Sequence, residues 1–134
     1  MKTPERDAWV KALRSDKFSQ SKHVLQDSRG FCCLGVACDI FAETLSLKVD
    51  KILYDGGGFE VFYNYDSQVL PSVVQKHLGL ISPEGLFKSP RREGAHPGET
   101  LSSVNDEGAT FEQIATMLED YEDLLFVEKK DWEK

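Results

Sequence analysis

The segment that most constrains the fold is the apolar run from Phe31 to Cys38, which continues to Glu43 with only two charges. Its Ala and Leu content and its lack of alternation favour a buried helix over a strand. The two charges, Asp39 and Glu43, are four residues apart and would mark the solvent edge of that helix. Gly35 in its middle costs about 1 kcal/mol relative to Ala. We therefore expect another element or a ligand to pack closely against the backbone at that point.

An α+β domain is predicted around this helix: a small antiparallel sheet whose central hairpin packs on the buried helix, with three further helices flanking it. The hairpin follows from Gly56-Gly57-Gly58, which permit positive φ in a turn, and from the alternation of apolar residues after them. Thr110 and Gln113 have the spacing of a capping box. The expected segments are helices at 4–15, 71–78 and 110–121, hairpin arms at 51–55 and 59–65, short strands at 23–25 and 86–87, and a strand or helical turn at 124–127.

The length of 134 residues suits a single globular domain, expected over residues 1–127. Residues 82–100, rich in Pro and Gly, are predicted to form a long mobile loop, and residues 128–134 a frayed acidic tail. The longest apolar run is far shorter than the ~18 residues that a membrane span needs. The odd count of three cysteines and the absence of a signal peptide at the N-terminus predict a cytoplasmic protein. The net charge of −7 argues against general nucleic-acid binding, which needs a basic surface.

Three patches of sequence together resemble a known family. They are WVKALRS at 9–15, FCCLGVACD at 31–39 and VNDEGATFEQIA at 104–115. These patches are similar to the "WV.ALRSG", "FCCLGVLCD" and "LND.G.TF..IA" motifs of small uncharacterised proteins from tailed-phage and prophage genomes. The resemblance implies a phage or prophage origin and a role in host takeover or counter-defence. It brings no catalytic residue and no cofactor with it.

The three cysteines, at 32, 33 and 38, allow two interpretations. On one helix Cys33 and Cys38 would lie about 140° apart, so they cannot converge on one metal ion and no metal site is predicted. Free cysteines commonly pack as small buried hydrophobes. Alternatively, Cys32 or Cys33 at the helix N-terminus would be a stabilised thiolate nucleophile, since the run after Cys33 faintly resembles papain-like peptidoglycan hydrolases. The predicted hairpin arms hold no histidine, so the base would have to be His77 or His96, with His23 a further candidate.

A ligand site is predicted between the sheet and the cysteine helix, near Gly35. The aromatic face of the hairpin would supply tyrosine hydroxyls to orient a planar ligand, although such faces are also typical of cores. The Arg91–Arg92 pair could hold a phosphate or stay solvated. Residues 105–108 form either a turn or the anion-binding start of a capped helix. The candidate ligand-binding residues are Gly35, Tyr54, Tyr63, Tyr65, Arg91, Arg92, Asn105 and Asp106.

Two functions are consistent with the sequence. The first is a non-catalytic binding module that acts on a host protein or a small-molecule ligand during infection. The second is a cysteine hydrolase of papain-like type. No cofactor is predicted for either function, and the sequence predicts no oligomeric state.

Overall fold

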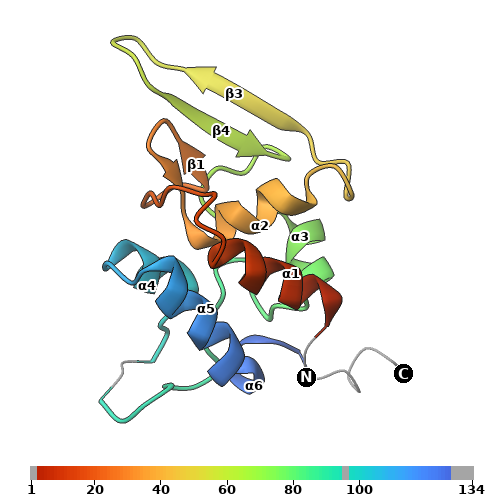
Figure 1. Cartoon of the computed structure of the whole chain (residues 1–134), viewed down its shortest axis with the longest axis vertical. Coiled ribbons are helices and arrows are strands. Elements are labelled where there is room, and N and C mark those ends of the chain that lie inside the picture. Colours follow the sequence, from red (N-terminus) through yellow and green to blue (C-terminus); the bar gives the residue numbers. More distant parts are fainter. Residues whose placement is uncertain (1–2, 95–96, 128–134) are drawn as a thin grey trace.

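The structure, a computed structural model, describes residues 3–94 and 97–127. The expected α+β class is confirmed, with a sheet at one end of the molecule and helices packed beneath it (Figure 1). The helices are α1 Pro4–Leu13, α2 Cys33–Phe41, α3 Ser72–Leu78, α4 Leu101–Asp106, α5 Phe111–Asp120 and α6 Glu122–Leu125. The strands are β1 Gln26–Asp27, β2 Gly30–Phe31, β3 Val49–Leu53 and β4 Phe59–Tyr63. His96 and the predicted tail at 128–134 lie outside the described residues.

The four strands form one antiparallel sheet in the order β2-β1-β4-β3. The predicted hairpin is present, but its arms are 49–53 and 59–63 instead of 51–55 and 59–65. The second arm ends early because Asn64 and Tyr65 have φ angles of 50° and 72°, which no strand accommodates. Tyr63 and Asp66 exchange backbone hydrogen bonds across this turn. Tyr65 therefore does not share the face of Val61 and Tyr63, as the alternation had predicted.

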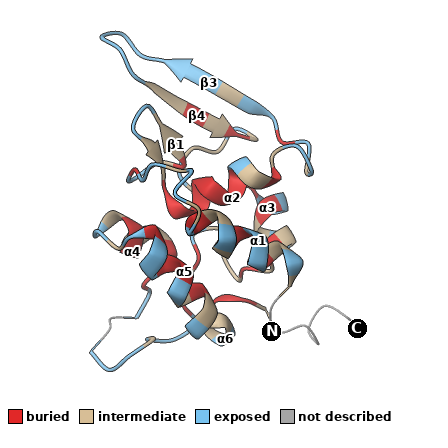
Figure 2. Ribbon diagram, viewed as in Figure 1, coloured by how far each residue is buried: buried red, intermediate tan, exposed pale blue. Residues whose placement is uncertain are grey.

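The buried helix is present as α2, which is shorter than the predicted 31–43 (Figure 2). Phe31 belongs to β2, where its N–H donates to the carbonyl oxygen of Ser19. Cys32 is the N-cap residue. Asp39 and Glu43 are both exposed, as expected for the solvent edge of this segment.

Gly35 marks a close contact between backbones. A Cβ atom at this position would lie 1.7 Å from the carbonyl oxygen of Leu25 in the segment before β1. Of the two occupants expected beside Gly35, another element of the chain is the one observed. The carbonyl of Leu25 fills the space in which a ligand had been predicted.

The remaining elements agree with the local sequence signals only in part. The capping box from Thr110 to Gln113 starts α5 as predicted. The strand predicted at 23–25 is wrong, because His23 has a φ of 73° and pairing begins at Gln26. Helix α4 was not predicted; it is six residues long and begins with a capping box of its own, from Thr100 to Ser103.

The segment 82–100 makes several contacts in its described part. Leu86 forms an isolated bridge with Thr100, where a short strand had been expected at 86–87. Phe87 is buried in the core. After α6 the chain returns to the body, where Phe126 bridges Leu80. The alternative of a strand or helical turn at 124–127 therefore resolves into the end of α6 followed by this bridge.

Candidate functional site

The three sequence patches meet at the N-terminus of α2. The indole Nε1 of Trp9 donates to the carbonyl oxygen of Cys33 at 3.0 Å. The side-chain oxygen of Asn105 accepts from the backbone N–H of Cys33 at 3.2 Å and from the amide of Gln20 at 2.8 Å. Its Nδ2 donates to the carbonyl oxygen of Ser21 at 2.9 Å. Asn105 is fully buried, so these bonds hold α4, α2 and residues 20–21 together.

Asp106 extends this set of hydrogen bonds to the protein surface. Its Oδ1 accepts from the backbone N–H of His23 at 2.8 Å, and its Oδ2 lies 3.3 Å from His23 Nδ1. Asn105 and Asp106 are the last two residues of α4, so this pair lies at a helix end, where the sequence had left residues 105–108 as a turn or the start of a capped helix. Their side chains bind residues 20–23 and the start of α2.

All three cysteines are free and buried. Burial raises the pKa of the Cys32 thiol to about 11, although backbone N–H groups of Leu34 and Gly35 act in the opposite direction. Burial also raises the pKa of Cys33 well above its usual value, and its S–H lies 3.7 Å from the carbonyl oxygen of Leu101. The pKa of Cys38 is raised by the same cause. At neutral pH these groups are thiols, which are poor nucleophiles.

The two described histidines have other partners. His23 pairs with Asp106, and His77 stacks edge-to-face on Phe41 with 4.7 Å between ring centroids. Within residues 3–94 and 97–127, neither histidine makes a hydrogen bond to a cysteine sulfur. The nucleophile and base that a hydrolase would require are thus not assembled in the described part of the chain.

The three candidate tyrosines lie in different surroundings. Tyr63 is buried, which raises its pKa, and its hydroxyl donates to the side-chain oxygen of Gln26 at 2.5 Å. Tyr54 follows β3 and bonds to Glu60 across the hairpin. Tyr65 is exposed, with the amine of Lys48 5.0 Å above its ring. They do not form one ligand platform.

Of the two candidate arginines, Arg91 has a dedicated partner. It binds the buried carboxylate of Glu99 through two contacts, at 2.8 and 3.3 Å, and this carboxylate raises the pKa of Arg91. Arg92 is exposed. The two guanidinium groups therefore have different surroundings and do not form the paired clamp that their adjacency suggested.

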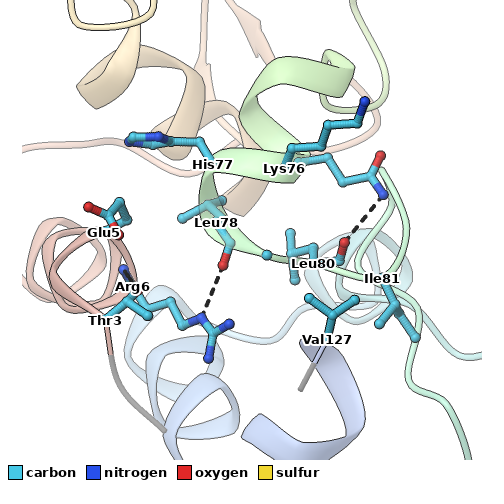
Figure 3. Close-up of a pocket in the computed structure, with 11 residues that line it drawn as sticks. Thr3, Glu5, Arg6, Lys76, His77, Leu78, Leu80, Ile81 and Val127 are labelled. Carbon is cyan, nitrogen blue, oxygen red and sulfur yellow. Dashed lines mark hydrogen bonds between the residues drawn. The ribbon is translucent and has the colours of Figure 1, made fainter. Parts of the chain in front are cut away.

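A cavity of about 620 Å³ opens where the N-terminus of α1 meets the C-terminus of α3 (Figure 3). Leu78, Leu80, Ile81 and Val127 give it an apolar wall, and polar groups lie around that wall. Three segments that are distant in the sequence build it, which is why no local pattern predicted it. The lining residues are Thr3, Glu5, Arg6, Gln75, Lys76, His77, Leu78, Gly79, Leu80, Ile81 and Val127.

Arg6 lies between this cavity and the core. Its Nε donates to the carbonyl oxygen of Leu78 at 3.0 Å, and its Nη1 lies 3.5 Å from Glu122 Oε2. The guanidinium also stacks on Phe126, 3.9 Å from the ring centroid. Burial lowers the pKa of Arg6 and Glu122 opposes that shift. One sequence signal could have identified this residue: Arg6 precedes Trp9 by three positions, which puts a cation on the buried face of α1.

Gly79 makes room for that cation. It ends α3 in the left-handed conformation, with φ of 82°, as expected for a glycine after a helix. A Cβ atom here would lie 2.8 Å from Nη2 of Arg6. The helix predicted at 71–78 ends at Leu78 as expected, and the glycine after it leaves the space that the guanidinium of Arg6 occupies.

Metal binding and membrane insertion would each need a recognisable arrangement of residues. In residues 3–94 and 97–127, no group of three or more His, Cys, Asp or Glu side chains is arranged to hold a metal ion. None of the helices described for this chain combines the length and apolarity needed to cross a bilayer.

A family model described as a domain of unknown function (DUF8296) matches residues 1–122 of the chain. No curated protein and no solved structure gives a significant match.

Proposed function

The chain belongs to the DUF8296 family of domains of unknown function, and we propose that it is a non-catalytic binding module whose α1/α3 cavity takes a small ligand. The cavity is the observation that carries this proposal. Its volume of about 620 Å³ lies within the range of roughly 300–1,000 Å³ typical of small-molecule sites. An apolar wall with a few polar groups around it is also typical of such sites.

The charge of the lining favours an anionic ligand. Arg6 and Lys76 line the cavity, and Glu5 is the one acidic residue among the described residues of its lining. This local excess of cationic groups contrasts with a chain whose net charge is −7. A molecule with an apolar body and one carboxylate or phosphate would match both the wall and the charges.

A binding role is supported over catalysis by the state of the cysteines. The hydrolase alternative needs an accessible thiolate beside an imidazole. Cys32 and Cys33 are buried with raised pKa values, and the described histidines contact Asp106 and Phe41. The feature in favour of the alternative is the position of Cys32 as the N-cap residue of α2.

The biological setting of the proposal rests on the sequence patches at 9–15, 31–39 and 104–115. Their similarity to proteins of tailed phages and prophages supports a binding event in the cytoplasm of an infected or lysogenic bacterium. Three free cysteines suit such a reducing compartment. The ligand would then be a host metabolite, bound during host takeover or counter-defence.

The proposal is tested by calorimetry with decanoate and decyl phosphate as anionic probes and decanol as the neutral one. We expect the wild-type protein to bind both anions about tenfold more tightly than decanol. Ile81→Trp, which fills the cavity, should abolish binding, and Lys76→Glu should weaken only the anions. Lys17→Glu, an exposed change outside the cavity, is the matched control.

A second experiment identifies the natural occupant. Protein recovered from lysate of infected cells is analysed by native mass spectrometry, with Ile81→Trp in parallel. A small molecule retained by the wild type and lost from the variant supports the proposal. Retention of one host protein by both forms, with no small molecule in either, would instead assign the module to a protein partner. Equal binding of every probe by the wild type and Ile81→Trp would contradict the cavity proposal.

A further inference from the structure

His77 is the lining residue of the α1/α3 cavity whose charge can change near neutral pH. It lies in the last turn of α3, and its half-buried ring packs edge-to-face on Phe41 of α2. In residues 3–94 and 97–127, no hydrogen bond or ion pair engages its ring nitrogens. Packing therefore holds the imidazole at the cavity, and its nitrogens are not committed to a partner within that part of the chain.

Charged groups of two helices line the cavity together with this imidazole. Glu5 and Arg6 come from α1, and Lys76 precedes the imidazole on α3. Helix α2 contributes the apolar ring of Phe41 at the contact. In Figure 3 the imidazole extends towards the side on which Glu5 is drawn, and the Lys76 side chain extends to the other side. The charge on the imidazole therefore adds to a small set of fixed charges.

Protonation of His77 would double the net positive charge of this set. Histidine is the side-chain type whose charge ordinarily changes between pH 5 and 8, whereas arginine, lysine and glutamate ordinarily keep theirs. With a neutral imidazole, the cationic Arg6 and Lys76 exceed the anionic Glu5 by one charge among the described residues of the lining. With an imidazolium, the excess is two.

We propose that His77 makes ligand binding in this cavity depend on pH, so that an anionic amphiphile binds more tightly in mildly acidic than in neutral solution. The inference rests on the proposed function, because it concerns the same cavity and the same class of ligand. One added unit charge in a partly exposed site should strengthen the binding of a monovalent anion by about three- to tenfold.

The fixed charges explain why the proton and the ligand bind together. Protonation of the empty cavity brings a third cation to the wall that holds Arg6 and Lys76, and Glu5 offsets only part of this repulsion. An anionic head group in the cavity compensates the remainder. Because such coupling is reciprocal, a bound anion raises the affinity of His77 for its proton by the same factor.

Calorimetry at pH 5.5 and 7.5 tests the proposal with decane sulfonate, which stays charged at both values, and with decanol as the neutral probe. We expect the wild-type protein to bind the sulfonate about three- to tenfold more tightly at pH 5.5, and decanol equally at both pH values. Titrations at pH 6.5 in two buffers of different ionisation enthalpy should show that the protein takes up protons when the sulfonate binds.

Variants assign the effect to one side chain. His77→Gln should abolish the difference in sulfonate affinity between the two pH values. His77→Lys carries a permanent charge and should bind the sulfonate tightly at both. His23→Gln is the matched control: it removes the other described histidine, which pairs with Asp106 and does not line the cavity, so the wild-type ratio should remain. Circular dichroism at both pH values checks that each variant is folded.

The outcomes separate this inference from the cavity proposal. Sulfonate binding that is equally tight at both pH values in the wild type would overturn the inference and leave the cavity proposal standing. A ratio that persists in His77→Gln would do the same. If neither the sulfonate nor decanol binds to the wild-type protein, the cavity proposal and the inference are both wrong.

Discussion

The side-chain oxygen of Asn105 accepts a hydrogen bond from the backbone N–H of Cys33, the first residue of α2. The N–H groups in the first turn of a helix have no partner within that helix, so a buried helix start needs one from elsewhere. Asn105 supplies it from α4, seventy-two residues away in the sequence. This hydrogen bond thus joins the sequence patches at 31–39 and 104–115.

Asn105→Ala should destabilise the protein strongly. The change leaves the N–H of Cys33 and the carbonyl oxygen of Ser21 buried without these partners. Each such group costs about 1–3 kcal/mol, so we expect the free energy of unfolding to fall by about 3 kcal/mol. Urea denaturation measures the loss. Glu107→Ala, an exposed change two residues further along the chain, should alter the stability by less than about 0.5 kcal/mol.

The substitution Gly35→Ala shows whether this helix position is packed or open, because the change in the free energy of unfolding has opposite signs in the two cases. In an open helix, alanine would stabilise by about 1 kcal/mol. Here the new methyl group would collide with the carbonyl of Leu25, so we expect a loss of about 3 kcal/mol or more. Thermal or urea unfolding gives the sign directly. A stabilised variant would mean that Leu25 does not approach α2 as closely as the structure places it.

Local patterns were sufficient where a few neighbouring residues decide the conformation. Thr110 with Gln113 was identified from its capping-box spacing, and the helix predicted at 71–78 agrees with α3, which ends at Leu78. Helix α4 was missed because its six residues are too short to show an amphipathic period, and its cap, Thr100 with Ser103, was the only signal. Tyr65 was assigned to the wrong face because alternation continues in the sequence after the backbone has turned.

No local sequence pattern could predict the candidate cavity. It joins residues 3–6, 75–81 and 127, which meet only after α1 and α3 have packed on the core. The hydrogen bonds of Asn105 likewise join patches that lie far apart in the sequence, and no single patch indicates them. The sequence therefore predicted the motifs and the buried helix, while tertiary packing determined which contacts the residues of those motifs make.

The cysteines should resist alkylation in the folded protein. A thiol at pH 7.5 whose pKa is about 11 is almost entirely protonated, and all three side chains are buried. We expect no incorporation of iodoacetamide over an hour in native buffer and three labels per chain in denaturant, counted by mass spectrometry. Rapid native labelling of Cys32 or Cys33 would support the hydrolase alternative and contradict the binding proposal.

Gly79→Ala tests the junction between the cavity and Arg6. Alanine is strained at a φ of 82°, and its methyl group would displace the Arg6 guanidinium. We expect a loss of about 2 kcal/mol in stability. Gly94→Ala has a similar φ of 86° with open space around it, and should cost only the strain, about 1 kcal/mol. Equal losses in the two variants would mean that Arg6 does not depend on the space at Gly79.

Stability should fall in alkaline solution because of the buried thiols. Cys32 has a folded pKa of about 11 against an ordinary value of 9.0, so the unfolded chain loses its proton first. The contribution of the buried Cys32 thiol to the free energy of unfolding is fully present below pH 9 and is lost as the pH rises from 9 towards 11. Two pH units correspond to about 2–3 kcal/mol for this group. Urea titrations at pH 8, 9 and 10 should show the decline, and Cys32→Ala should reduce its slope. A slope unchanged by Cys32→Ala would show that this thiol is not the group that titrates.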